Sequence, residues 1–174
     1  VVINPSLGWE EDSEAQPAGF SILGLPQDGT LAQYVRVPIR NLYEKPAHLR
    51  LEEAAALPLG GLTAFRAVFR KAELHAGEKV LISGVGGGVA TFALQWAVHA
   101  GAEVYVTSGK AEKIEKAIAA GAKGGVDYRA EGWAEKLKEL SGGGVDVVID
   151  SALGDGFAKF LEIANPGGRI VFFG

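Results

Sequence analysis

The chain has 174 residues, a net charge of −4 and no cysteine. These values exclude disulfides and thiolate metal sites within it, and they give no basic surface for nucleic acid or an anionic membrane. No apolar run reaches the roughly 20 residues that cross a bilayer, so we expect no membrane partner, and the lack of cysteine fits a reducing cytoplasmic location.

The first fifty residues are typical of strands and loops. Prolines recur through this region and limit helix length. Leu31–Pro38 predicts a strand entered from the turn at Asp28 and Gly29. Glu10, Glu11, Asp12 and Glu14 indicate a solvated acidic loop rather than a metal site, because no histidine lies nearby.

A helical pattern begins at Leu51, with Glu52 and Glu53 in the first turn, where negative charge is favoured. We expect this helix to break at Pro58 and Gly60-Gly61. A second helix is predicted over Leu62–Lys71.

Beyond Gly77 strands and helices alternate. Strands are predicted at Val80–Ile82, Glu103–Thr107, Val126–Tyr128, Val145–Ile149 and Arg169–Phe173, and helices at Val89–Ala100, Glu112–Ala120, Trp133–Leu140 and Phe157–Ala164. Repeated strand–helix units with short links predict right-handed crossovers and a parallel sheet covered on both faces, a doubly wound α/β domain. Since the first of these helices is apolar nearly all round, we expect it to pack between the sheet and another layer.

The segment following Lys79–Ile82 carries the chemistry. It runs from a strand through Gly84, Gly86, Gly87 and Gly88 directly into a helix. Gly84 permits a tight turn, Gly87 lets the backbone approach a pyrophosphate, and small Ala90 lets helix and strand pack closely. This context, at the first strand–helix turn of a repeating α/β pattern, favours a dinucleotide site.

The end of the second strand indicates which dinucleotide binds. NAD-binding domains usually place an acid about 20 residues past the glycines, whereas Ser108 stands 24 residues after Gly84. Gly109, Lys110 and Lys113 follow. A small polar pocket flanked by cations suits a 2′-phosphate, so the sequence predicts NADPH.

The chain begins with Val1 in a strand-like run, contains no methionine, and closes in another apolar run. We interpret it as a piece of a longer protein.

Taken in order, the motifs resemble the medium-chain dehydrogenase/reductase superfamily, and in particular its zinc-independent quinone-reductase-like branch. The matching segments are Gly29–Tyr34 with Val37-Pro38, Glu52–Pro58 with Gly61–Ala64, Gly84–Ala90, Gly121-Ala122 with Val126–Tyr128, Val145–Ser151 and Gly167–Ile170. The resemblance implies a GroES-like β-barrel catalytic domain, partly present as residues 1–50. It also implies a Rossmann domain over 51–174 that is truncated at its C-terminus, and a homo-oligomer, either a dimer or a tetramer.

The resemblance also implies roles for individual residues. In the family the active site lies in the cleft between these two domains, and Thr63 would contact the nicotinamide side of that cleft. Gly84, Gly87, Gly88 and Val89 would hold the pyrophosphate. Gly109, Lys113 and Tyr128 would surround the adenosine 2′-phosphate end. Related proteins carry tyrosine at the place of Arg66, so the resemblance assigns no cofactor contact to Arg66.

Zinc-dependent relatives carry a ligating cysteine in the stretch corresponding to Leu57–Thr63, where this chain has Leu59. We read His48, His75 and His99 as surface or capping residues and assign no metal ligand. Without zinc, the resemblance implies hydride transfer from NADPH to a small quinone or α,β-unsaturated carbonyl. The alternatives are a zinc-type alcohol dehydrogenase with another ligand in place of cysteine, and an NADPH-binding protein without turnover. The catalytic residue stays unassigned, because His48 and Tyr34 are candidate proton donors by chemistry only.

Overall fold

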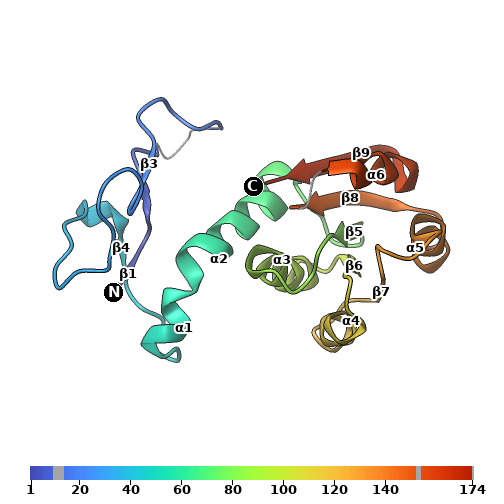
Figure 1. Ribbon diagram of the computed structural model, residues 1–174, viewed down its shortest axis with the longest axis horizontal. Coiled ribbons are helices and arrows are strands. Elements are labelled where there is room, and N and C mark those ends of the chain that lie inside the picture. The colour runs from blue at the N-terminus through green and yellow to red at the C-terminus, as the bar shows by residue number, and fades with distance from the viewer. Residues whose placement is uncertain (10–13, 152–153, 174) are drawn as a thin grey trace. The chain divides into compact units, whose positions relative to one another are not determined.

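The computed structural model describes residues 1–9, 14–151 and 154–173 and divides into two compact units, Val1–Leu59 and Gly60–Gly174 (Figure 1). The first unit contains short elements: β1 (Val2–Ile3), β2 (Ser6–Leu7), β3 (Ser21–Ile22), η1 (Ile39–Asn41), β4 (Leu42–Tyr43) and α1 (Leu51–Ala55). β1 pairs with β4 and β2 with β3, both antiparallel. The buried Asn41 side chain donates hydrogen bonds to the carbonyl oxygens of Asn4 and Ser6, both at 2.8 Å, and so joins the two strand pairs.

The strand predicted at Leu31–Pro38 is absent from the structure. This segment is irregular, and Leu31 and Tyr34 are almost fully exposed. A strand needs a neighbour to accept and donate its ladder hydrogen bonds, and within the described residues no strand pairs with this one. Most of the predicted acidic loop, Glu10 to Asp12, lies outside the described residues.

The predicted helix break at Pro58 and Gly60-Gly61 is also wrong. A helix, α2, runs from Leu57 to Phe65 and continues as a π-helical segment, η2, from Arg66 to Lys71. Pro58 is tolerated because it lies in the first turn, where an N–H has no partner inside the helix. A Cβ on Gly60 would come within 3.3 Å of the Phe92 ring and 3.7 Å of the Gly88 carbonyl carbon. The glycine therefore allows α2 to pass close to the start of the next helix.

The second unit has the predicted alternation. Its strands are β5 (Lys79–Ile82), β6 (Glu103–Thr107), β7 (Gly124–Val126), β8 (Val145–Asp150) and β9 (Ala164–Phe172); its further helices are α3 (Gly88–His99), α4 (Ala111–Ala119), α5 (Trp133–Ser141), η3 (Gly154–Gly156) and α6 (Phe157–Ile163). All neighbouring strands are parallel, and the order in the described sheet is β7-β6-β5-β8-β9. This is the Rossmann order, which reverses between β5 and β8. The predicted fold class is confirmed.

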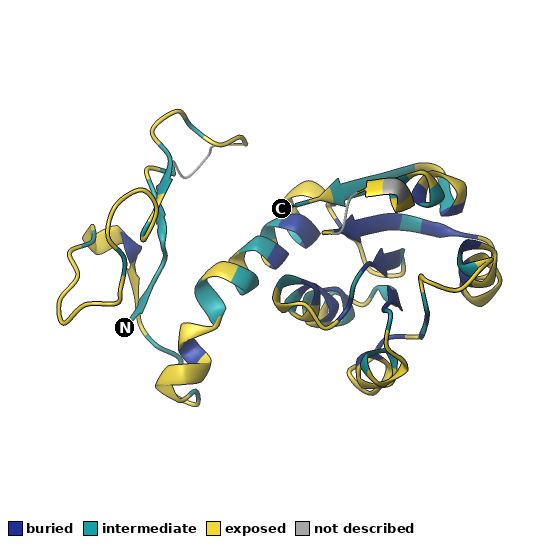
Figure 2. Cartoon of the chain, in the orientation of Figure 1, coloured by how far each residue is buried: buried dark blue, intermediate teal, exposed yellow. Residues whose placement is uncertain are grey.

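The sheet is covered on both faces, and its central strands are buried (Figure 2). Alternate residues of β5 point to opposite faces, so Val80 and Ile82 join one core cluster and Leu81 joins the other. The first cluster includes residues of α2, η2, α3 and α4, and the second residues of α5 and α6. As predicted, α3 packs between the sheet and another layer, where its Trp96 meets Phe65 and Phe69 edge to face. Among the described helices, none has the length and apolar character to span a membrane.

The third strand begins two residues earlier than the sequence predicts. β7 is Gly124–Val126, and Asp127 and Tyr128 lie just beyond its end. A Cβ on Gly125 would lie 2.6 Å from Val106 Cγ2, 2.8 Å from Ile114 Cγ2 and 2.9 Å from the Val106 carbonyl oxygen. The glycine lets α4 and β6 close directly onto β7.

We expect Gly125→Ala to lower the free energy of unfolding by about 1–3 kcal/mol, the range for overpacking a filled core. The reason is that a backbone oxygen and two β-branched side chains have little room to move. Urea denaturation measures the change. Gly156→Ala is the matched control, because a Cβ there meets nothing within 4 Å; equal stability of the two variants would contradict the tight packing at β7.

An ion pair joins Glu78, directly before β5, to Arg169 in β9. Arg169 Nη2 lies 2.7 Å from both carboxylate oxygens of Glu78, and Arg169 Nε donates to the Ala72 carbonyl oxygen at 2.6 Å. Burial alone would raise the pKa of Glu78, but the bonds from Arg169 and from the His75 N–H outweigh it and hold the pKa below its ordinary value of 4.5.

Because the folded-state pKa is lowered, this carboxylate stabilises the protein above about pH 4.5, and the contribution is lost as pH falls through the folded-state pKa. We expect Glu78→Gln to reduce stability at pH 7 by about 1 kcal/mol, a low value for a charged pair because both side chains are partly exposed. The difference in stability between Glu78→Gln and the unmodified protein should shrink near pH 3. Urea titrations at both pH values test this, with Glu162→Gln, in an exposed pair with Lys159, as the control.

Candidate functional site

The glycine loop connects β5 to α3 at the carboxyl edge of the sheet. Gly84 and Gly86 have φ values of +61° and +98°, in the left-handed region that favours glycine. The Gly84 N–H donates to Thr107 Oγ1 at 3.1 Å, and the Val85 N–H donates to the Thr107 carbonyl oxygen at 2.8 Å. The end of β6 therefore fixes the position of the loop.

The loop delivers the chain to the N-terminus of α3. Gly87 is the N-cap residue, it has no side-chain cap, and its carbonyl oxygen accepts the first helical bond from the Thr91 N–H at 3.0 Å. The first N–H groups of a helix have no partner within it and lie at the positive end of its dipole. The predicted residues Gly84, Gly87, Gly88 and Val89 are thus together in a cradle that fits a phosphate group.

Lys113 reaches this cradle from α4. A Cβ on Gly86 would lie 2.6 Å from Lys113 Cδ and 3.1 Å from its Nζ, so the lysine side chain crosses directly over the loop. The sequence predicted Lys113 only at the 2′-phosphate end of a cofactor. The structure places its ammonium group against Gly86, which adds a cation to the positive end of α3.

A second part of the site forms where β6 and β7 end. We call it the corner, and it contains Ser108, Gly109, Lys110 and Tyr128. Ser108 is buried, and its Oγ accepts a hydrogen bond from the Lys110 N–H at 3.3 Å. A Cβ on Gly109 would lie 3.2 Å from the Tyr128 hydroxyl oxygen. The structure thus brings Tyr128, which is half exposed, against the Ser108–Lys110 turn, although the two are in different loops.

Arg129 is a residue of this corner that sequence reasoning missed. Its Nη2 donates to the Gly109 carbonyl oxygen, and its Nε and Nη2 donate to the two carboxylate oxygens of Asp127 at 3.1 Å and 2.9 Å. The Arg129 side chain and its backbone N–H lower the pKa of Asp127. A cation directly after Tyr128 was the available signal, but its partner, Gly109, lies twenty residues away in the sequence.

A buried pair lies at the point where the strand order reverses. Ser83, at the end of β5, donates its hydroxyl to Asp150 Oδ1 at the end of β8, and Asp150 is fully buried. Ligands of open α/β sheets bind in the crevice outside this point. The pair joins the ends of these two strands at the residue that directly precedes the glycine loop.

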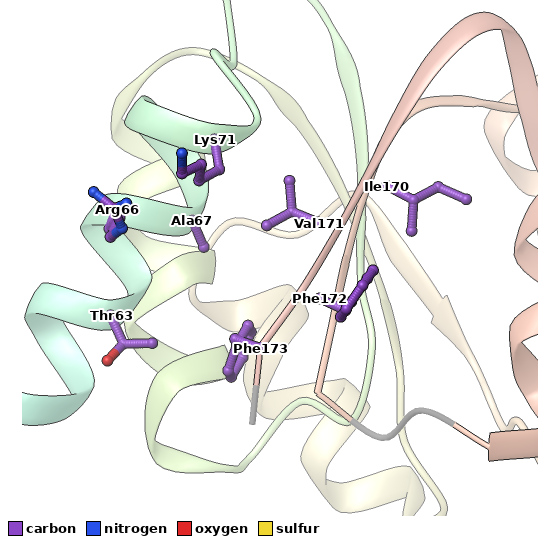
Figure 3. A pocket seen from close by; sticks show the side chains of 8 residues that line it. All are labelled: Thr63, Arg66, Ala67, Lys71, Ile170, Val171, Phe172 and Phe173. Atoms are coloured by element: carbon purple, nitrogen blue, oxygen red, sulfur yellow. The ribbon is translucent and has the colours of Figure 1, made fainter. Parts of the chain in front are cut away.

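Thr63 lies on α2. It lines a pocket of about 450 Å³ together with Arg66 and Lys71 on the helical side (Figure 3). The opposite wall comes from the last residues of β9 and from Phe173, which follows it. Arg66, the residue that departs from related proteins, thus shares a pocket with Thr63.

The remaining sequence candidates lie in the first unit. Leu59 is 62% exposed and lines a second pocket, of about 460 Å³, with apolar residues of β1 and α1. Tyr34 and His48 are both exposed. Within residues 1–9, 14–151 and 154–173, no group of three or more histidine and carboxylate side chains is arranged to hold a metal ion.

Comparison with known proteins decides the family. A family model described as "Zinc-binding dehydrogenase" matches residues 88–174, half of the chain. The chain belongs to the zinc-binding dehydrogenase family. This membership confirms the predicted resemblance at the level of the medium-chain dehydrogenase/reductase superfamily, whose cofactors are of the NAD(P) type. It leaves the choice between NAD and NADP, and the branch within the superfamily, as predictions.

The relatives of this chain carry names of both branches. "Zinc-type alcohol dehydrogenase-like protein YogA" from Leptosphaeria maculans is 36% identical over all of this chain and 52% of its own. "Quinone oxidoreductase 1" from Escherichia coli is 38% identical over 74% of this chain and 40% of its own. Among solved structures, one titled "Crystal Structure of NAD-dependent alcohol dehydrogenase" matches 98% of this chain and 52% of its own with a TM-score of 0.89 and 36% identity. The chain spans about half the length of the curated relatives it matches.

Proposed function

We propose that this chain is the cofactor-binding part of an oxidoreductase that transfers hydride from NADPH to a quinone or an α,β-unsaturated carbonyl without zinc. The observation that carries the proposal is the position of Lys113 across the glycine loop, combined with Ser108 in place of an acid at the end of β6. A carboxylate there would repel a 2′-phosphate, whereas a hydroxyl and a cation attract one.

The residues of the chain bind and orient the cofactor. The N–H groups at the start of α3 hold the diphosphate, the Lys113 ammonium attracts the 2′-phosphate, and the corner at Gly109 and Tyr128 receives the adenosine end. When bound, the cofactor supplies the hydride, so the protein's share is position and electrostatics. Because Thr107 fixes the loop through two hydrogen bonds, the cradle keeps its shape before any ligand arrives.

The substrate class follows from the side chains that the first unit offers. Leu59 presents an apolar side chain where zinc-dependent relatives have a cysteine, and the residues that line its pocket are apolar except for Thr30. Such a surface suits an uncharged, flat acceptor whose carbonyl is already activated by conjugation. The likeness to a quinone oxidoreductase supports this choice.

A second candidate is an alcohol dehydrogenase of the zinc type that uses NAD. The names of the Leptosphaeria maculans relative and of the solved dehydrogenase favour it. In that case a residue other than Leu59 would supply the zinc ligand that the cysteine supplies in zinc-dependent relatives.

The two candidates differ in cofactor, metal content and substrate. The experiment measures oxidation of NADPH and of NADH by the whole protein with a panel of quinones and enones, alongside reduction of NAD with simple alcohols and elemental analysis for zinc. We expect NADPH-dependent reduction of at least one quinone or enone and no stoichiometric zinc. Alcohol oxidation together with one zinc per chain would replace the proposal with the second candidate.

A further inference from the structure

We propose that Asp127 and Arg129 form a charge-masking pair that determines whether the cofactor site accepts a 2′-phosphate. The inference rests on the proposed function and names the residues that set its cofactor choice. The ligand is the 2′-phosphorylated adenosine end of the cofactor, and Arg129 acts by neutralising the acid that this corner contains.

The pair lies directly against the corner. Asp127 and Arg129 flank Tyr128 in the loop after β7, and the Arg129 guanidinium bridges from the Asp127 carboxylate to the carbonyl oxygen of Gly109 in the loop after β6. A Cβ on Gly109 would meet Arg129 Nε at 3.0 Å and the Tyr128 hydroxyl at 3.2 Å. Arginine, tyrosine and glycine therefore meet at a single turn, with the carboxylate bound behind them.

The charges explain why the arginine is needed. The sheet lacks an acid at the end of β6, but Asp127 places one at the end of the neighbouring β7, and Arg129 lowers its pKa, so it is ionised near neutral pH. An ionised carboxylate without a partner would repel a 2′-phosphate and would instead accept a hydrogen bond from a ribose 2′-hydroxyl. Bound in a bidentate fashion by Arg129, it contributes little net charge to the corner.

Arg129 also differs from an ordinary surface cation in its contacts. It holds the Gly109 carbonyl oxygen, and so it connects the Ser108–Lys110 turn to the loop after β7. Lys159 and Lys116, by comparison, pair with carboxylates three or four residues away on their own helices. The contact across two loops couples this charge pair to the shape of the predicted adenosine corner.

The experiment measures binding of adenosine 2′,5′-bisphosphate and of 5′-AMP to the whole protein by isothermal titration calorimetry. The variants are Arg129→Ala, Arg129→Lys, Asp127→Asn and the double variant, with Arg70→Ala as a control at an exposed arginine on η2. The carboxamide introduced by Asp127→Asn would keep an oxygen that accepts the Arg129 N–H, so this substitution removes the charge and leaves the turn.

We expect Arg129→Ala to weaken binding of the bisphosphate by about tenfold, because one charge pair is lost, and binding of 5′-AMP by less than about twofold. Arg129→Lys should recover part of the loss. Asp127→Asn should strengthen the bisphosphate, and the double variant should bind it better than Arg129→Ala alone, because the repelling charge is gone. A merely structural role would weaken both ligands alike and would gain nothing from the second substitution.

Two results would overturn the inference, and they are distinguishable. If the unmodified protein prefers the bisphosphate but Arg129→Ala binds both ligands as before, or loses both equally, the pair does not select the phosphate, while the proposed NADPH dependence stands. If the unmodified protein binds 5′-AMP as well as the bisphosphate, the proposed cofactor itself is wrong and the inference falls with it.

Discussion

Lys113→Ala should weaken NADPH binding by about 10- to 150-fold, the range that corresponds to losing a charge-assisted hydrogen bond of about 1.5–3 kcal/mol. Its ammonium group lies against Gly86, and its stem packs on the loop. Binding is measured by the change in nicotinamide fluorescence for NADPH and NADH in parallel. Because NADH lacks the 2′-phosphate that the lysine is proposed to attract, NADH affinity should change by less than about threefold.

Lys116→Ala is the matched control, since it removes an exposed lysine three residues later on the same helix, α4. We expect it to change neither affinity by more than about threefold, as is usual for an exposed charge. An equal loss of NADPH and NADH affinity in Lys113→Ala would assign the lysine to the diphosphate and would contradict its proposed role in the choice of cofactor.

The second large effect concerns stability. Leu81 lies in the central strand, is fully buried and belongs to the core cluster that α5 and α6 cover. We expect Leu81→Ala to lower the free energy of unfolding by about 3 kcal/mol, within the range for leucine-to-alanine changes in filled cores. Chemical denaturation followed by far-UV circular dichroism measures it.

Leu161→Ala on α6 is the control, because that leucine is 63% exposed and belongs to neither cluster. Its effect should stay within about 0.5 kcal/mol. Similar losses in both variants would mean that the central strand is less tightly packed than the structure indicates.

The doubly wound sheet was predictable because its signals are local. Each buried strand is an apolar run, and several helices end at a glycine such as Gly101 or Gly121, both with positive φ. The glycine loop was predictable for the same reason, since a strand, several glycines and a helix follow one another without a gap.

Three features were not predictable from local pattern. Glycine usually ends a helix, but Gly60 lies within α2 because Phe92 and Gly88 need the space. Glycine is also a poor strand residue, yet Gly125 lies in β7 because Ile114 and Val106 close over it. Leu31–Pro38 has the residues of a strand but has no neighbour in the described structure. In each case a residue distant in sequence determines the outcome.

The residues and contacts of the candidate site also divide into those that the sequence could identify and those that it could not. Ser108, Gly109 and Lys113 could be named because they follow a recognisable strand at a known offset. The contact of Lys113 with Gly86 and that of Arg129 with Gly109 could not, because both join segments that follow different strands. Sequence spacing identifies the strand edge, and only the folded arrangement shows which side chains meet there.

The two hydrogen bonds from the glycine loop to Thr107 have a kinetic and entropic consequence. A loop with several glycines loses much conformational freedom when a ligand orders it, and that loss weakens affinity. Here the ordering has already occurred during folding, so a nucleotide meets a preorganised surface. Association should then proceed in one step without a slow isomerisation, and differences in affinity among nucleotides should be expressed in their dissociation rates.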